Sequence, residues 1–315
     1  RLPYKYVLID EYQDMSRPRY ELIRTLREQS DFTLFCVGDD WQSIYRFAGS
    51  DIHLILDFAD ILRDWGPTRL FQLTAPRRFR QSLIDASGAF VMQDKSLYAK
   101  QLRNPSDKKD YSLKALGGAT QEERFDAIVE QLRKLPKAAP VLMLGRSRTP
   151  PKRPEPAVAQ RPRRAVPNRR AYRRHRFSGK TGHGHQIHDR ARFQGSATRF
   201  RFSAVLFRRF EGFPKRDSGR AAARMPHAEE RRLFYVAMTR CKKKLFFVVD
   251  QSRPSRFMYE LHDRICPNIF RGVKLPPQCP NCGEALRLRH TGSDPSRAFY
   301  GCTGFPNCRY TRPCK

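Results

Sequence analysis

The first 50 residues alternate between short apolar runs and polar residues that can carry chemistry. One apolar run spans 6–9 and is followed by Asp10 and Glu11, and a second run ends at Val37 and is followed by two more aspartates. Between them, Ser16 is a candidate helix N-cap that precedes apolar residues at helical spacing. Strand, helix and strand in this order form the basic unit of a parallel sheet. We therefore expect the acidic residues to gather at one sheet edge, where ligands bind in such folds.

The hydrophobic pattern predicts further helices and strands along most of the chain. Thr120 and Glu123 have the spacing of a capping box, and Pro136 ends the helix that follows. At 315 residues the chain is long enough for two domains with substantial cores. We predict an α/β fold, with helices over 51–65, 121–135 and 227–240 and strands over 69–73, 141–144 and 245–249.

The sequence between 146 and 225 differs from the rest of the chain. It is rich in Arg, Pro and Ala and shows neither helical nor alternating periodicity. Three interpretations are open: a disordered basic arm for nucleic acid, a metal-binding tract, or a stretch translated in the wrong reading frame. The metal-binding interpretation depends on four histidines, which are His175, His183, His185 and His188.

We favour the wrong reading frame for this stretch. A structured domain rarely contains a patternless insert of this length. In addition, codons can be chosen for 189–196 that encode Thr-Val-His-Ala-Ser-Lys-Gly-Leu when they are read one nucleotide later. We therefore expect 146–225 to be out of frame or disordered.

The net charge of +31 and the pI of about 10.5 would by themselves indicate a polyanionic partner. More than half of this excess lies within 146–225, so charge alone does not identify the partner. The sequence has no signal peptide and no apolar span of about 18 residues, which predicts that no segment crosses a membrane.

The acidic pair formed by Asp10 and Glu11 suits phosphate chemistry. One carboxylate can orient Mg2+, usually through water, while the other polarises a water that attacks a terminal phosphate. Gln13 and Gln42 can sense that phosphate. For the acidic pair taken alone, two solvated carboxylates at a strand end are an alternative that stays open.

The longer stretches around these residues closely resemble two motifs of a known family. Asp-Glu-Tyr-Gln-Asp at 10–14 and Gly-Asp-Asp-Trp-Gln-Ser-Ile-Tyr-Arg-Phe at 38–47 resemble motifs II and III of superfamily 1 DNA helicases of the UvrD/Rep type. The resemblance implies a RecA-like P-loop NTPase core that couples ATP hydrolysis to 3'-to-5' movement along DNA. It also implies ATP and Mg2+ as cofactors.

The same resemblance implies roles for individual residues. Asp10 would bind Mg2+ and Glu11 would be the catalytic base. Gln42 would couple the γ-phosphate of ATP to DNA held by Tyr45 and Phe47, whose alternative role is core packing. Aromatic stacking on single-stranded bases tolerates any sequence, which suits a translocating motor.

Two later segments resemble motifs of the same helicases. The segment 74–79 resembles motif IV and would bring Arg78 to the γ-phosphate, although Arg77 stands where a tyrosine that stacks on adenine is usual. The segment 227–240 resembles motif VI, in which Arg240 would be an arginine finger. The alternatives are a basic turn and an amphipathic helix with a cation at its C-terminal end. The shifted-frame peptide at 189–196 resembles motif V.

A phosphate-binding loop ending in Gly-Lys-Ser/Thr does not precede the first acidic strand. The tripeptide 179–181 ends like such a loop, but Arg174 occupies the place of its first glycine. We therefore expect a C-terminal fragment of an ATP-dependent helicase that is inactive alone. The alternative from another class is a non-catalytic DNA-binding protein derived from a decayed helicase.

Four cysteines near the end of the chain have the spacing C-x2-C-x19-C-x5-C, which suits tetrahedral Zn2+; they are Cys279, Cys282, Cys302 and Cys308. Together with the residues before the third cysteine, they resemble the C4 zinc ribbon of bacterial type IA topoisomerases. This resemblance implies contact with single-stranded DNA through Phe299 and Tyr300, helped by Tyr310, Arg297 and Arg309. Disulfides and a purely structural zinc are the alternatives.

These interpretations give one layout for the chain. We expect single-stranded or partially duplex DNA as the partner, ATP, Mg2+ and Zn2+ as cofactors, and a bacterial-type cytoplasmic protein associated with the nucleoid. The expected parts are 1–66 as the end of a first RecA-like domain, 67–250 as a second one, 251–274 as a linker and 275–315 as the zinc ribbon.

Overall fold

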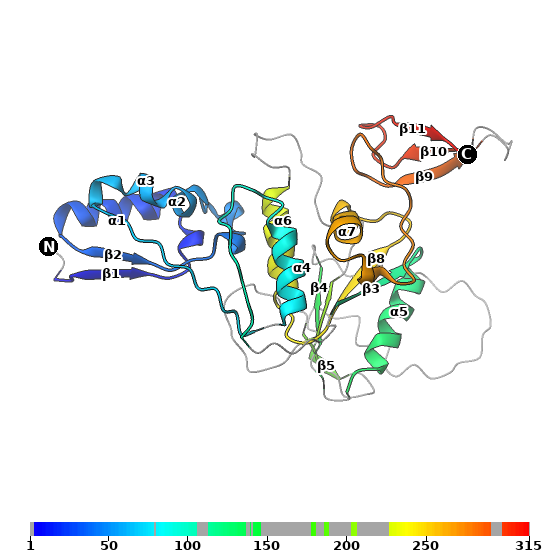
Figure 1. The fold of residues 1–315 in the computed structure, drawn as a ribbon, viewed down its shortest axis with the longest axis horizontal. Helices are drawn as coiled ribbons and strands as arrows, with labels where there is room; N and C mark the ends of the chain where they lie inside the picture. Colours follow the sequence, from blue (N-terminus) through cyan, green and yellow to red (C-terminus); the bar gives the residue numbers. More distant parts are fainter. Residues whose placement is uncertain are drawn as a thin grey trace.

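Within the residues that it describes, the computed structural model contains three separate sheets. Two parallel strands lie near the N-terminus, six strands form the central sheet, and three antiparallel strands lie near the C-terminus (Figure 1). The residues that the structure describes are 3–78, 80–105, 113–136, 139, 141–145, 178–180, 186–188, 203–206, 227–290 and 298–314.

The N-terminal part confirms the predicted order of strand, helix and strand. Strands β1 (Tyr6–Ile9) and β2 (Thr33–Cys36) pair in parallel, with Tyr6 opposite Thr33 and Ile9 opposite Cys36. Helix α1 (Arg17–Gln29) connects them, and extended Ser16 is its N-cap, although the serine side chain makes no capping hydrogen bond. The two strands therefore end at the same edge.

The helix expected over 51–65 is broken into three short pieces. Leu54 and Leu62 are buried in the same cluster as Tyr12, so both ends of the segment are held by the core. Between them, Asp57 departs from helical backbone angles and interrupts the helix. The pieces are α2 (His53–Leu56), α3 (Phe58–Ile61) and the 3-10 helix η4 (Arg63–Trp65).

The prediction of a strand over 69–73 is wrong. The segment is not a strand, and its apolar side chains Leu70, Phe71 and Leu73 are exposed. Nothing in the described part of the chain pairs with it, and a strand needs a partner to satisfy its backbone groups. The next regular element is helix α4 (Gln81–Val91).

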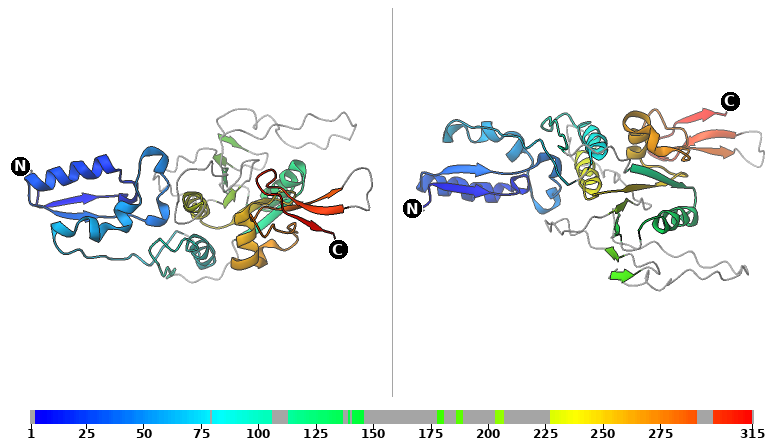
Figure 2. Two further views of the ribbon diagram at one scale, coloured as in Figure 1. Left: turned by 90° about the horizontal axis from the view of Figure 1, so that it is seen from above. Right: turned by 60° about the horizontal axis from the view of Figure 1, so that its bottom comes forward.

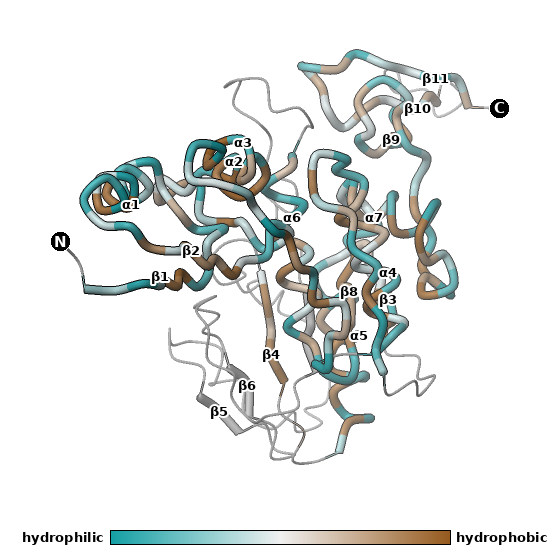
Figure 3. Tube along the Cα trace, turned by 60° about the vertical axis from the view of Figure 1, so that its left-hand side comes forward, coloured by the Kyte–Doolittle hydropathy of each residue, from teal (hydrophilic) through white to brown (hydrophobic). Residues whose placement is uncertain are grey.

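The central sheet has the strand order β3-β8-β7-β4-β6-β5, and all neighbours are parallel except β5 and β6. Mostly parallel sheets are buried on both faces, and Figure 3 shows hydrophobic residues along β4 and β8. The strands are β3 (Leu113–Gly118), β4 (Val141–Leu144), β5 (Ser178–Lys180), β6 (Gln186–His188), β7 (Ser203–Leu206) and β8 (Leu245–Asp250).

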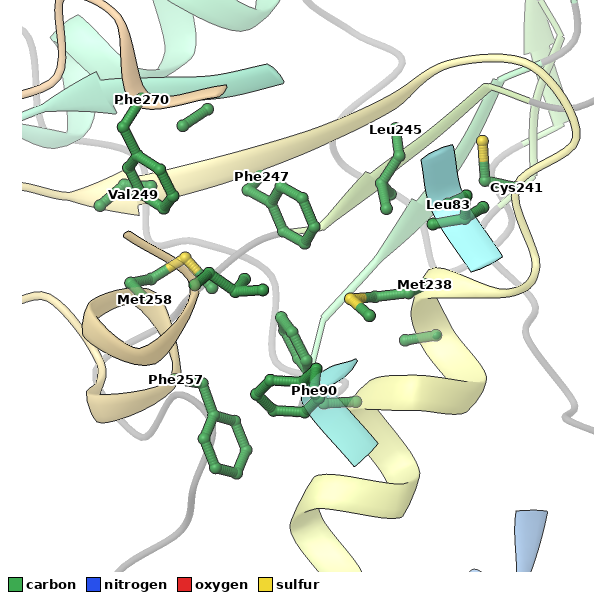
Figure 4. Close-up of a cluster of buried hydrophobic side chains, with 14 of the residues drawn as sticks. Leu83, Phe90, Met238, Cys241, Leu245, Phe247, Val249, Phe257, Met258 and Phe270 are labelled. Carbon is green, nitrogen blue, oxygen red and sulfur yellow. The ribbon is translucent and has the colours of Figure 1, made fainter. Parts of the chain in front are cut away.

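Helices cover the two faces of this sheet. On one face lies α5 (Gln121–Arg133), and the predicted capping box is confirmed because Thr120 Oγ1 accepts a hydrogen bond from the backbone N of Glu123 at 3.2 Å. On the other face, α4 and α6 (Ala228–Met238) pack against β8 through Phe90, Phe234 and Phe247 (Figures 1 and 2). Figure 4 shows this second layer of the core in close-up.

The stretch from 146 to 225, for which no regular element was predicted, supplies β5, β6 and β7. Strand β7 lies between β4 and β8, in the middle of the sheet. The remaining residues of this stretch, including the candidate histidines at 175, 183 and 185 and the shifted-frame peptide at 189–196, lie outside the described residues.

The segment expected as a linker, 251–274, is instead part of the central core. Phe257 and Leu261 are fully buried, and the rings of Phe90 and Phe257 are 4.9 Å apart. The prediction missed these elements because runs of five residues are too short to show a helical stripe. They are α7 (Arg256–Glu260), the π-helix Leu261–Ile265 and the 3-10 helix Pro267–Phe270.

The C-terminal sheet has the order β11-β10-β9 and is antiparallel. It is attached to the central part by Arg287, whose Nε donates to the Ser252 carbonyl at 3.2 Å. Its strands are β9 (Leu286–His290), β10 (Ala298–Cys302) and β11 (Thr311–Pro313). Among all described helices, none is both long and apolar enough to cross a membrane.

Candidate nucleotide and DNA site

The ends of β1 and β2 bring the predicted acidic residues together. Val37 N donates to the Ile9 carbonyl at 2.8 Å, and Tyr12 N donates to the Val37 carbonyl at 2.9 Å. Gly38 follows, and a Cβ at this position would lie 2.9 Å from Gln13 Oε1. A side chain at this position would crowd Gln13, so glycine suits the close approach of the two loops.

Glu11 is held in an unusual conformation at this edge. Its φ of 50° and ψ of 41° lie in the left-handed region, which costs a residue with a side chain free energy. Its carboxylate Oε2 accepts a hydrogen bond from Gln13 Nε2 at 2.6 Å. Its backbone N donates to Asp10 Oδ1 at 2.8 Å, and both acids are exposed. The predicted Mg2+ ligand and the predicted base thus lie side by side at the surface.

Gln13 and Gln42 meet through Asp39. Gln13 is only 2% exposed, and its Oε1 accepts from the backbone N of Asp39 at 2.9 Å. Asp39 Oδ2 in turn accepts from Gln42 Nε2 at 2.6 Å. The structure therefore places Gln13, predicted to contact ATP, inside a hydrogen-bonded chain from Glu11 to Gln42.

Two arginines from the part of the chain after residue 66 interact electrostatically near this edge, Arg240 with Glu11 and Arg78 with Arg240. Arg240 lies just beyond the end of α6 and is half-buried, and among the described residues its Nε has no hydrogen-bond partner. Burial and the nearby charge of Arg78 lower the pKa of Arg240, and Tyr45 and Glu11 act on it in the opposite direction. An arginine stays charged even so. Two guanidinium groups whose charges act on each other, one of them with an Nε left without a partner among the described residues, suit a polyanion such as a triphosphate.

Asp14 also belongs to this cluster, although its place in motif II predicted no role for it. Burial, followed by the charge of Glu11, raises the pKa of Asp14 to about 6. Its Oδ1 is buried without a hydrogen-bond partner among the described residues. Such a shift from burial and a like charge is common at functional sites.

The two predicted DNA-stacking residues have different exposures. Phe47 is 82% exposed, whereas Tyr45 is half-buried. Their ring centroids are 5.7 Å apart. Burial raises the pKa of Tyr45, and the charges of Asp14 and Glu11 act in the same direction. Phe47 therefore offers the free stacking surface.

Contacts that the sequence did not reveal join motif III to helix α6. Trp41 is buried and packs edge-on against Tyr235 of α6 at 5.4 Å between ring centroids. Arg232, also on α6, donates from Nε to the Ser43 carbonyl at 2.7 Å. These partners are far apart in the sequence, so no local pattern could have found them.

The four predicted zinc ligands come together at the base of the C-terminal sheet. Their sulfur atoms all lie within 4.8 Å of one another, with 3.3 Å between Cys282 Sγ and Cys302 Sγ and 3.8 Å between Cys279 Sγ and Cys308 Sγ. Tetrahedral Zn2+ with bonds of about 2.3 Å requires sulfurs about 3.8 Å apart. Gly304 N donates to Cys302 Sγ at 3.2 Å, as expected beside a thiolate. The arrangement fits Zn2+.

Phe299 and Tyr300 lie on opposite faces of the C-terminal sheet. Phe299 is paired with Arg289, whose side chain lies across Gly301 next to the phenyl ring. Tyr300 instead packs against the cysteine cluster, and the Arg312 guanidinium lies 5.2 Å from its ring centroid. One DNA strand therefore cannot stack on both rings from the same side. Arg297 lies outside the described residues.

Family models match three parts of the chain. The UvrD/REP helicase N-terminal domain matches residues 1–62, and the UvrD-like helicase C-terminal domain matches residues 210–252. The second match overlaps the end of the stretch 146–225. The topoisomerase DNA-binding C4 zinc finger matches residues 277–315.

Individual relatives agree with these matches. The chain is 29% identical to DNA helicase IV of Escherichia coli (strain K12) over 81% of its own length and 35% of that protein. It is 36% identical to the putative ATP-dependent DNA helicase YjcD of Bacillus subtilis (strain 168) over 33% of its length and 13% of that protein. The chain thus spans about a third of the first relative and less of the second.

Proposed function

This chain is built from parts of the UvrD/Rep helicase N- and C-terminal domains and a topoisomerase-type C4 zinc ribbon, and from that premise we propose that it contributes the hydrolytic edge and DNA contacts of an ATP-dependent 3'-to-5' DNA helicase. One observation carries the proposal. Glu11 and the chain of hydrogen bonds to Gln42 lie on one side, and the charge of Glu11 acts on Arg240, whose Nε has no hydrogen-bond partner in the described part of the chain.

In the proposed reaction a water attacks the γ-phosphorus of ATP, the bond to the β,γ-bridging oxygen breaks, and ADP and phosphate leave. Glu11 takes the proton of the attacking water, and Asp10 supplies the carboxylate that would hold a Mg2+ ion. Such an ion, when bound, offsets the charge of the phosphates. Arg240 and Arg78 stabilise the charge that develops on the transferred group.

We place single-stranded DNA on two aromatic surfaces. The Phe47 ring contacts the ring of Tyr45, which follows Gln42 in motif III. A movement of motif III on ATP binding can therefore be transmitted to the base that stacks on Phe47. Phe299 with Arg289 supplies a second surface on the zinc ribbon. An aromatic ring flanked by a guanidinium can stack on any base and bind its phosphate. A helicase that acts on nucleoid DNA in the bacterial cytoplasm requires such sequence-independent binding.

Hydrolysis requires a phosphate-binding loop, and the sequence of this chain contains no Gly-x-x-x-x-Gly-Lys-Ser/Thr motif. We propose that the loop acts together with this chain in the complete protein, and that the chain without it does not hydrolyse ATP. The partial coverage of DNA helicase IV supports this part of the proposal.

Strand displacement tests the proposal. The complete protein should separate a labelled duplex that carries a 3' single-stranded tail, only with ATP and Mg2+, and should leave a duplex with a 5' tail intact. Binding of both duplexes without separation would favour the non-catalytic DNA-binding alternative.

A further inference from the structure

Lys100 lies against two consecutive carboxylates of motif III. Its Nζ is 2.5 Å from Asp39 Oδ1 and 2.5 Å from Asp40 Oδ1, and it lies 4.9 Å from the centroid of the Trp41 ring. The lysine side chain is 16% exposed and that of Asp40 is 1% exposed. One nearly buried lysine thus forms ion pairs with both carboxylates.

Asp39 is the branch point of the acidic edge. Its Oδ2 accepts from Gln42 Nε2 at 2.6 Å, and its Oδ1 accepts from Trp41 N at 3.1 Å as well as from Lys100. Its own backbone N donates to Gln13, which leads to Glu11. A rotation of the Asp39 carboxylate would therefore release the Gln42 amide.

Lys100 itself is held by its neighbours. Tyr98 N donates to Asp40 Oδ2 at 2.8 Å, and the Tyr98 carbonyl accepts from Trp41 Nε1 at 3.0 Å. The Tyr98 hydroxyl donates to the Leu56 carbonyl at 2.9 Å. The segment after α4 is therefore fixed on motif III, and the lysine has little freedom to leave Asp39.

We propose that Lys100 is a positioning residue for ATP hydrolysis, because it holds the Asp39 carboxylate that in turn holds Gln42 at the edge of the site. This inference rests on the proposed function, since Gln42 has to face the transferred phosphate. Lys100 acts through Asp39 and does not touch the nucleotide. Its removal therefore lowers turnover and leaves the affinity for ATP unchanged.

The test measures kcat and KM for ATP in the complete protein with saturating single-stranded DNA. Lys100→Met should lower kcat about tenfold and leave KM within about twofold, because a small displacement of a positioned group costs mainly turnover. Lys100→Arg, which keeps the charge, should recover part of the rate. Lys95→Met, which removes an exposed lysine of the same segment, is the matched control and should match the parent.

A double-mutant cycle separates positioning from a general structural role. In an Asp39→Asn background, Lys100→Met should change kcat no further, because the group it acts through is already altered. Additive losses, an unchanged kcat for Lys100→Met, or a raised KM with unchanged kcat would overturn the inference. If Lys100→Met does not fold, Lys100→Arg and Asp39→Asn provide the same cycle.

The parent and Glu11→Gln proteins are measured in the same assay. An active parent with a silent Glu11→Gln variant and a normal Lys100→Met variant overturns this inference alone. A parent whose hydrolysis is absent or independent of Glu11 overturns the proposed function and this inference with it.

Discussion

The Arg232 guanidinium donates from Nε to the carbonyl oxygen of Ser43 at 2.7 Å, across 189 residues of sequence. Ser43 directly follows Gln42, and Arg232 lies on α6, two turns before Arg240. One buried hydrogen bond thus ties the segment of the predicted γ-phosphate sensor to the helix that leads to the predicted arginine finger. The two sides of the proposed site are therefore mechanically connected.

Replacing Arg232 should destabilise the chain strongly. Arg232→Met leaves the buried Ser43 carbonyl unpaired and removes the cation 3.8 Å from buried Asp94. Breaking such a buried pair costs about 3 kcal/mol. Urea unfolding measures this loss. Arg63→Met, which breaks an ion pair with both side chains 76% exposed, is the control and should cost less than about 1 kcal/mol. Equal effects would contradict the structural role of Arg232.

Asp14 should make stability depend on pH. Because its folded pKa is about 6, above the usual value, the folded chain keeps a proton that the unfolded chain has already lost. This contribution is complete at low pH and is lost as the pH rises through about 6. Asp14→Asn should therefore be more stable than the parent near about pH 8 and similar to it near about pH 4, by urea unfolding at each pH. A stability difference that does not change with pH would contradict the assignment.

The cysteine cluster should bind one zinc ion per chain. Cys302→Ser removes a buried ligand, so zinc should be lost and the ribbon should unfold, because zinc supplies about 10 to 16 kcal/mol in small zinc domains. Elemental analysis of the purified protein measures the metal. Cys314→Ser changes an exposed cysteine outside the cluster and should keep the zinc. An unchanged zinc content in Cys302→Ser would refute the site.

The two faces of the ribbon should respond differently to truncation. Phe299→Ala should weaken binding of an oligothymidine by about 1 to 3 kcal/mol, because a stacking surface is lost. Tyr300→Ala, which removes the ring on the face of the cysteine cluster, should leave the affinity nearly unchanged as long as the zinc content is that of the parent. Fluorescence anisotropy at fixed salt measures both affinities. A larger loss for a zinc-loaded Tyr300→Ala than for Phe299→Ala would place the DNA on the other face.

The sequence predicted the acidic edge well because its parts are local. Strand, helix and strand follow from periodicity, and parallel pairing then brings Asp10 and Asp39 to the same edge. The separation of Phe299 from Tyr300 was also predictable, since neighbouring residues in a strand face opposite ways. Both had been expected to contact DNA.

Other features were not predictable from local patterns. Lys100 contacts Asp39 across 61 residues of sequence. Nothing in the local sequence distinguishes this lysine from an ordinary surface lysine. The segment 251–274 resembles a linker because its helices are shorter than two helical turns, yet Phe257 completes the central core. In both cases the tertiary fold decides the role.

The turnover of Glu11→Gln in the complete protein tests the central claim most directly. The assay measures ATP hydrolysis with and without single-stranded DNA, and Glu21→Gln, an exposed change on α1, is the control. Glu11→Gln should lower the stimulated rate by about 10^2 to 10^4, because it removes the base and keeps the shape of the side chain. The control should match the parent. A Glu11→Gln rate within a few-fold of the parent would contradict the assignment of this edge as the site of ATP hydrolysis.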